Sequence, residues 1–147
     1  MTNDHDERPE KLSIVVFSGD FDKIHYALVM ASAAAAIDIP ATLFFTMGAS
    51  RALLASPSWR TLAPGEIGRD GQTAGDIDDG FKSRTVADFE DLLQACVTLN
   101  VKFMVCDMGL RAMDLEGVAL RDDVPIESGG MVTFLNDARA LGQMVFI

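Results

Sequence analysis

VKFMVCDMGLRAMDL, residues 101–115, is the stretch of sequence that decides the fold. Its first five residues are mostly apolar, and the residues after Cys106 have the composition of a short helix. A short apolar run that leads straight into a helix is typical of a buried strand in a parallel sheet. The same stretch places Cys106, one of the chain's two cysteines, at the junction between strand and helix.

Strand-like and helix-like segments alternate on both sides of this stretch. Strands are expected at residues 12–17, 41–45, 101–105, 124–126 and 144–147, and helices at 21–37, 86–99, 107–115 and 131–140. Strands that alternate with helices form parallel sheets covered on both faces. The sequence therefore predicts a three-layer α/β/α domain with a mostly parallel five-stranded sheet, flavodoxin-like in appearance.

The length of 147 residues fits one domain. Residues 1–10 are polar and are expected to form a disordered tail, and residues 11–147 are expected to form the domain. Within it, residues at about 55–84 carry two prolines, several glycines and an acidic run, without a clear helix or strand period. An irregular excursion of this length is typical of a functional lid, an interface element or a disordered segment.

Acidic residues outnumber basic ones by 22 to 12, which gives a formal net charge of −10. Such a chain repels nucleic acid and anionic membranes, so neither is expected as a partner. The N-terminal MTNDHDERPEK lacks the apolar run of a signal peptide. No apolar stretch approaches the roughly 18 residues that suggest a membrane helix. These features predict a cytoplasmic protein.

Ligands of open α/β sheets bind beyond the carboxyl ends of the strands. Four segments of this chain reach that edge, and two of them are glycine-containing turns whose free backbone N–H groups favour an anion. The residues expected to line this backbone anion pocket are Ser18, Gly19, Asp20, Thr46, Gly48, Asp107, Met108, Ser128, Gly129 and Gly130. In the alternative, the glycines only allow tight turns.

Cys106 lies on the same edge and has two interpretations. A position at the start of a helix lowers the pKa of a thiol and favours the reactive thiolate. Asp107 opposes this effect, and Arg111, one turn along the helix, would offset it if its side chain folded back. In the other interpretation Cys106 fills the core, because free cysteine is among the most buried residue types. Position alone does not decide between them.

Cys96 and His25 are weaker candidates for chemistry. Cys96 belongs to the apolar face of the helix at 86–99 and is expected in the core. It should lie about 17 Å from Cys106, at the other end of the intervening strand, whereas a disulfide needs Cα atoms within about 7 Å. His25, about one turn into the first helix, is either an ordinary helical residue or an auxiliary group that reaches Cys106.

Motifs of several common sites are missing from the sequence. Residues 75–83 resemble a phosphate-binding loop, but Phe81 interrupts the Gly-Lys-Ser ending and no strand precedes it. The chain has no GxGxxG, HExxH or CxxC pattern, and its acidic run lacks the glycine of a calcium-binding loop. We therefore expect no nucleotide site, no metal site and no cofactor.

Four segments together resemble the DsrE/DsrF-like family of sulfur-relay proteins, and within it the subgroup described as peroxiredoxin-like or DsrE-related. They are residues 18–36, 41–54, 86–115 and 124–147. The matching features are the Ser-Gly-Asp-Phe-Asp-Lys start of the first helix at 18–23, Phe44-Phe45-Thr46 at the second strand, Cys106 after the third strand and Gly129-Gly130 before the last helix.

The resemblance implies a sulfurtransferase-like carrier that forms homo-oligomers. Cys106 would hold sulfane sulfur as a persulfide, taken from a donor protein and passed to an acceptor protein. Family members often have a small polar residue after this cysteine, where the present chain has Asp107. The middle region is shorter and less basic than in such relatives, so the identities of donor and acceptor do not carry over.

Two other functions stay open at this point. In the first, the same fold is a non-catalytic module that binds a small anion or a partner and forms oligomers, with Cys106 as filler. The second is a thiol peroxidase, which ranks lower because only Arg111 is close enough in sequence to support a peroxidatic cysteine. Solvent exposure of the Cys106 sulfur separates the carrier from the binding module.

Overall fold

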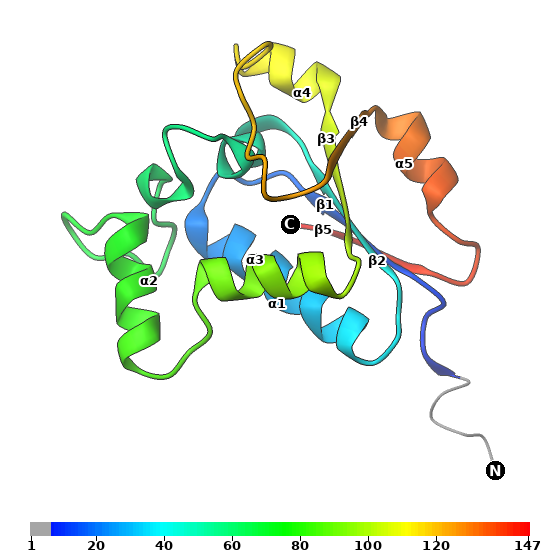
Figure 1. Cartoon of the computed structure of the whole chain (residues 1–147), viewed down its shortest axis with the longest axis horizontal. Coiled ribbons are helices and arrows are strands. Elements are labelled where there is room, and N and C mark those ends of the chain that lie inside the picture. The colour runs from blue at the N-terminus through cyan, green and yellow to red at the C-terminus, as the bar shows by residue number, and fades with distance from the viewer. Residues whose placement is uncertain (1–6) are drawn as a thin grey trace.

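The computed structural model describes residues 7–147, so the first six residues of the expected tail lie outside the described residues. Five parallel strands form one sheet in the order β4-β3-β2-β1-β5 (Figure 1). The strands are β1 (Leu12–Val16), β2 (Ala41–Phe45), β3 (Lys102–Cys106), β4 (Ile126–Gly129) and β5 (Gln143–Phe146). The expected five-stranded parallel α/β fold is confirmed.

Helices cover both faces of this sheet and give the domain three layers (Figure 1). They are α1 (Phe21–Ala36), α2 (Ala74–Ser83), α3 (Phe89–Thr98), α4 (Asp107–Ala112) and α5 (Met131–Asp137), with the 3₁₀ helices η2 (Met47–Leu53) and η3 (Trp59–Thr61). No helix within residues 7–147 is both long and apolar enough to cross a membrane.

The larger core lies between the sheet and the layer formed by α1 and α3. Every second residue of each strand points into this core; Ile14, Leu43 and Phe103 are examples, and all three are buried. β-Branched and aromatic side chains suit this position because they pack well on a pleated surface. From α1, the small side chains of Ala27 and Ala31 let the helix approach the strands closely.

The opposite face of the sheet carries a smaller core under α5. The alternate strand residues that face this side pack against Phe134 of α5, and the cluster consists of Val15, Phe44, Met104, Cys106 and Phe134. Within α5 only Phe134 is buried, and its ring lies 4.9 Å from that of Phe44. At the end of α5, Asp137 accepts hydrogen bonds from Lys11, Thr42 and Lys102.

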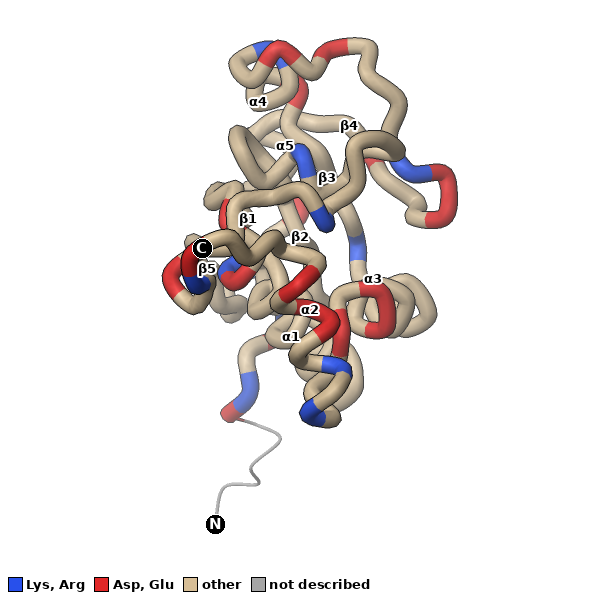
Figure 2. The backbone as a smooth tube through the Cα atoms, turned by 90° about the vertical axis from the view of Figure 1, so that its left-hand side faces the viewer, with Lys and Arg blue, Asp and Glu red and all other residues tan. Residues whose placement is uncertain are grey.

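Helix α2 lies within the region expected to be an irregular excursion. It begins with a capping box, in which Thr73 Oγ1 accepts the N–H of Asp76 and the Asp76 carboxylate accepts the N–H of Thr73. The buried Asp78 of the same helix accepts the N–H of Phe89 at 2.8 Å. This hydrogen bond ties α2 to the start of α3, and both helices carry clusters of acidic residues (Figure 2).

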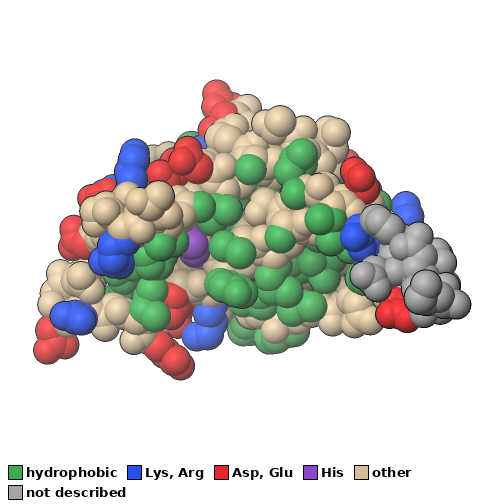
Figure 3. Space-filling model, turned by 90° about the horizontal axis from the view of Figure 1, so that it is seen from below, with side chains coloured by type: hydrophobic (Ala, Val, Ile, Leu, Met, Phe, Trp, Pro, Cys, Tyr) green, Lys and Arg blue, Asp and Glu red, His purple; other side chains and the backbone are tan. Residues whose placement is uncertain are grey.

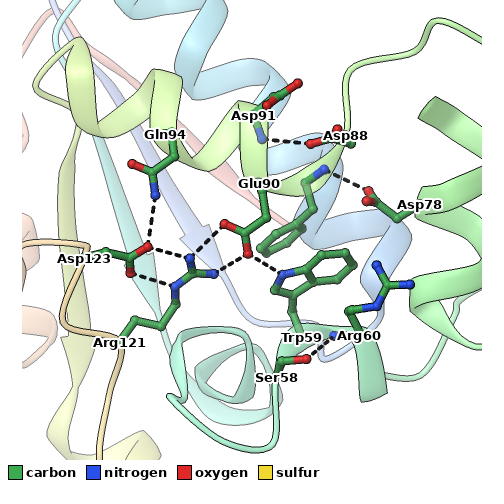
Figure 4. A network of polar contacts seen from close by, with 11 residues as sticks. Ser58, Trp59, Arg60, Asp78, Asp88, Glu90, Asp91, Gln94, Arg121 and Asp123 are labelled. Atoms are coloured by element: carbon green, nitrogen blue, oxygen red, sulfur yellow. Dashed lines mark hydrogen bonds and ion pairs between the residues drawn. The ribbon is translucent and has the colours of Figure 1, made fainter.

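A network of polar side chains holds the loop between α4 and β4 against α3 and η3 (Figure 4). Arg121 donates to both carboxylate oxygens of Glu90, at 2.7 and 2.8 Å, and to Asp123 at 2.7 Å. The indole N–H of Trp59 donates to Glu90 at 2.8 Å. Hydrogen bonds from Arg121 hold the pKa of Glu90 below its usual range, because burial, which opposes them, is the smaller effect.

Candidate functional site

Cys106 is both the last residue of β3 and the N-cap of α4. Its Sγ accepts the backbone N–H of Gly109 at 3.4 Å, in the role that Ser, Thr, Asp or Asn usually fills. The hydrogen bond aims a backbone N–H donor directly at the sulfur. The neighbouring Asp107 is exposed to solvent.

Gly109 is required by the way α4 packs on η2. A Cβ at this position would lie 2.6 Å from Thr46 Oγ1 and 2.7 Å from the backbone nitrogen of Met47. Only glycine lets α4 come this close to the carboxyl end of β2. The close approach fixes the backbone N–H of Gly109 where it meets the Cys106 sulfur.

The Cys106 thiol is covered in this structure, with the residue 3% exposed. It belongs to the smaller core with Phe134, and Gly129 of β4 lies beside it in register. A reagent therefore reaches this sulfur only after a local opening, and Phe134 of α5 belongs to the buried cluster around it. The sequence left the exposure of Cys106 open; by this criterion, the burial seen here favours the binding module, and a carrier requires a local opening that uncovers the sulfur.

The residues expected to form one anion pocket fall into two groups. Gly19 and Gly48 lie against each other, with a Cβ on Gly19 only 3.3 Å from the Gly48 carbonyl, and with Asp20 they line a cavity of about 560 Å³. The cavity also contains Arg51. The second group surrounds Cys106, which does not line this cavity.

The remaining pocket residues take positions around these two groups. Ser18 Oγ accepts the N–H of Asp20, and Thr46 is buried beneath α4. Met108 is exposed on α4, and Ser128 is exposed on the edge strand β4. Gly130 has open space where a side chain would be and is the N-cap of α5.

Arg51 is the charged residue of this edge that the sequence reasoning missed. It follows the turn after β2 and lies in η2, with its side chain in the cavity beside Gly19 and Gly48. A signal was present, because Arg51 is the single Lys or Arg between Lys23 and Arg60 and lies six residues after the end of β2. The cavity therefore combines a guanidinium with the Asp20 carboxylate.

His25 does not lie beside Cys106, which corrects the expectation that it could reach the thiol. Its Nε2 is 2.8 Å from the Ala87 carbonyl oxygen, and its ring packs on Phe81 and Phe21 in the α1–α3 layer. Cys106 belongs to the core on the other face of the sheet. The sequence showed that both groups are near the carboxyl edge, but not that the sheet separates them.

Arg111 does not support the thiol either. Its side chain is exposed, and within residues 7–147 it makes no hydrogen bond or ion pair with Cys106 or Asp107. The offset of the Asp107 charge that the sequence suggested is therefore not made in this conformation.

Cys96 is a core residue. It is fully buried beneath α1, where its Sγ lies 3.7 Å from the Leu28 carbonyl oxygen. Burial raises the pKa of this thiol to about 12, so it stays neutral at ordinary pH. The two cysteines are free and lie in the two different cores. Within residues 7–147, no group of three His, Cys, Asp or Glu side chains is placed to hold a metal ion.

These features define an α/β protein with one cysteine at a strand–helix junction, at the carboxyl end of β3. The model of the DsrE/DsrF-like family matches residues 10–141, and the chain belongs to this family. The chain is similar to the uncharacterized protein YrkE of Bacillus subtilis strain 168, with 26% identity over 96% of this chain and 99% of YrkE.

The crystal structure of the YchN protein from E. coli shares the fold. It superimposes with a TM-score of 0.56 over 93% of this chain and 98% of YchN, at 15% sequence identity. At this identity the likeness concerns the fold alone.

Proposed function

We propose that this protein carries sulfane sulfur as a persulfide on Cys106, with a donor protein on one side of the transfer and an acceptor protein on the other. Membership of the DsrE/DsrF-like family supports a sulfur-relay type of function in general. The observation that carries the finer proposal is the hydrogen bond from the Gly109 N–H to Cys106 Sγ, which aims a backbone donor at the sulfur of the expected carrier residue.

The transfer needs no external oxidant or reductant. The Cys106 thiolate attacks the terminal sulfur of a donor persulfide, R–S–SH, and a new S–S bond forms between Cys106 Sγ and that terminal sulfur. The S–S bond of the donor breaks and the donor leaves as the thiolate R–S⁻. An acceptor thiolate then takes the terminal sulfur of the Cys106 persulfide in the same way. The N–H of Gly109 is placed to stabilise the negative sulfur before loading and after unloading.

Loading requires a local opening, because the thiol is covered. Helix α5 has seven residues, of which only Phe134 is buried, and α4 has six. Short helices with few buried side chains open at a low free-energy cost. We infer that displacement of α5 exposes the sulfur, while Asp137 keeps the far end of α5 attached to the sheet.

The experiment incubates the protein with a low-molecular-weight persulfide and reads the intact mass. Wild type and Cys96→Ala should each gain one sulfur, and Cys106→Ser should gain none. Serine keeps the N-cap hydrogen bond, so this variant removes the thiol without removing the cap. A wild type that gains no sulfur, or a Cys106→Ser variant that still gains it, would overturn the proposal.

A second function is favoured by the burial of Cys106 and by the open cavity at Arg51. In this alternative the chain is a non-catalytic module, and the Arg51 guanidinium with the backbone at Gly19 and Gly48 binds a small anion. Calorimetric titration with thiosulfate tests it. Arg51→Gln should abolish the heat of binding and Cys106→Ser should leave it unchanged, while absence of binding to wild type would exclude this function.

A further inference from the structure

The outer side of β5 is an unpaired edge of the sheet. β5 is the terminal strand of the five, and its N–H groups at Gln143 and Ile147 donate inward to β1. Because alternate residues of a strand face opposite neighbours, the backbone groups of Met144 and Phe146 face outward. Among residues 7–147, no other element pairs with this side.

The two edges of the sheet are protected differently. On β4, Pro125 precedes the strand and the charged Glu127 is exposed, which are the usual devices that prevent edge-to-edge pairing. On β5, residues 142–147 contain neither proline nor charge. Because β4 is protected against edge-to-edge pairing and β5 is not, we expect a partner to cover the β5 edge.

Exposed apolar side chains flank β5 on both faces of the sheet. On the α5 face, Phe146 is 69% exposed and its ring lies 5.3 Å from that of the half-exposed Phe17. On the α1 face, a hollow of about 840 Å³ remains beside β5; its apolar lining includes Tyr26, Val29, Ile67, Val86 and Ile147, and it is also lined by Asp22, Lys23, His25 and Glu66. Apolar side chains gather across this helical side of the molecule (Figure 3).

The outward face of α1 continues the same surface. No charged residue occurs between Lys23 and Asp38, although Tyr26 is 61% exposed and Ala33 and Ala36 are exposed too. A helix that is apolar all round is typically buried on all sides.

We propose that two copies of this chain pair antiparallel through β5, about a two-fold axis that passes beside Val145. Met144 of one copy then lies opposite Phe146 of the other, and each such pair exchanges both of its backbone hydrogen bonds. The two five-stranded sheets become one continuous sheet. The same rotation places the two α1 helices on the same face of the combined sheet, one on each side of the hollows beside β5.

A second copy is the occupant that this surface fits. The outward groups of β5 are complementary to themselves under a two-fold rotation, as an isologous interface requires. Copies that each carry a net charge of −10 repel one another, and residues 142–147, which have no charged side chain, are a segment at which they can meet without adding to that repulsion. The second copy would also cover exposed apolar side chains beside β5, among them Phe17, Tyr26, Met144 and Phe146.

Disulfide trapping tests the register of this pairing. In a background of Cys96→Ala and Cys106→Ser, Val145→Cys places two thiols at a non-hydrogen-bonded pair about 4.5 Å apart between Cα atoms, within disulfide range. Mild oxidation should give a covalent dimer that a reductant separates. Val132→Cys, on the 72% exposed residue of α5, is the matched control and should stay uncrosslinked.

Light scattering tests the assembly itself. Wild type should have a mass that is an even multiple of the 15.9 kDa protomer, and Met144→Lys with Phe146→Lys should lower it by at least half. An odd multiple, a mass unchanged by the lysines, or a Val145→Cys variant that does not crosslink would each overturn the pairing. The test does not depend on sulfur transfer, because the crosslinking background lacks both native thiols.

Discussion

Replacement of Asp137 by asparagine should destabilise the protein by about 3 kcal/mol. The Asp137 side chain is 13% exposed and accepts three hydrogen bonds, from Lys11 at 2.6 Å, Thr42 at 2.7 Å and Lys102 at 2.8 Å. These bonds attach the end of α5 to β2 through Thr42, to β3 through Lys102, and to Lys11, the residue before β1. Asp137 is therefore the polar anchor of the layer that covers Cys106.

The magnitude follows from the charge that is left behind. The Lys11 side chain is 9% exposed, so its ammonium group would remain buried without a carboxylate, which typically costs about 3–5 kcal/mol. The Lys102 side chain is 41% exposed and returns to water at little cost. An asparagine oxygen that still accepts one hydrogen bond recovers part of the loss, which gives the lower end of the range.

The assay is urea unfolding of wild type, Asp137→Asn and a control variant. With a slope of about 2 kcal/mol/M, the midpoint should fall by about 1.5 M. Asp79→Asn is the control, because its side chain is 64% exposed in a pair with Arg60, and it should change stability by less than about 0.5 kcal/mol. An equal, small effect of both substitutions would refute the assignment of Asp137 as an anchor.

The pH dependence gives an independent check. Burial alone would raise the pKa of Asp137, but hydrogen bonds from Lys102, Lys11 and Thr42 outweigh it and hold the pKa well below its usual range. A depressed pKa adds stability that is fully present above the unfolded value of about 3.9 and is lost as the pH falls below it. The difference between wild type and Asp137→Asn should therefore be full at neutral pH and shrink under acidic conditions; a difference that persisted undiminished in strong acid would contradict this.

Three further predictions concern the cover of the thiol and the loop that follows it. Phe134→Ala removes the buried side chain of α5 and should raise the rate of Cys106 alkylation at least tenfold, read by mass spectrometry; an unchanged rate would show that the thiol is uncovered by another route. Gly109→Ala should cost about 1–3 kcal/mol in urea unfolding, because its Cβ meets Thr46, whereas Gly130→Ala has open space and should be neutral. Arg121→Met should cost about 1–2 kcal/mol, since its partners are half-exposed, and a neutral result would mean that the loop is held by backbone bonds alone.

The central strands could be placed from the sequence because their signal is local. β1, β2 and β3 are runs of β-branched, aromatic and aliphatic residues, and their bounds agree with expectation to within a residue or so. The edge strand β4 was expected at 124–126 but lies at Ile126–Gly129. An edge strand needs no apolar run, so Glu127 and the glycine that follow Ile126 gave no strand signal.

Helix α2 was missed because its composition argues against a helix. Gly75, Gly80 and three aspartates are poor helix formers, and the helix exists because tertiary contacts override that preference. Its start was nevertheless visible, since Thr73 followed three residues later by Asp76 has the spacing of a capping box. The helical spacing of Ala74, Ile77 and Asp78, which are buried, follows directly after.

Only the local part of the site, at the end of β3, could be predicted from the sequence. The position of Cys106 at the end of β3 follows from its local sequence, but its burial depends on Phe134, which comes from a helix 28 residues later. The separation of His25 from Cys106 depends on which face each helix covers. Right-handed crossovers place α1 and α3 on one face, and the return from β4 to β5 places α5 on the other, so this part could have been derived once the strand order was known.

The strand order also determines how the proposed pairing would affect the proposed thiol. β3 and β5 are three positions apart in the sheet, so a second copy on β5 leaves the surroundings of Cys106 free. Across the paired sheet the two β3 strands are seven positions apart, or about 34 Å at the usual strand spacing. The two thiols could not form a disulfide with each other, because that requires Cα atoms within about 7 Å. Each would therefore receive and release sulfur independently, at opposite ends of one continuous sheet.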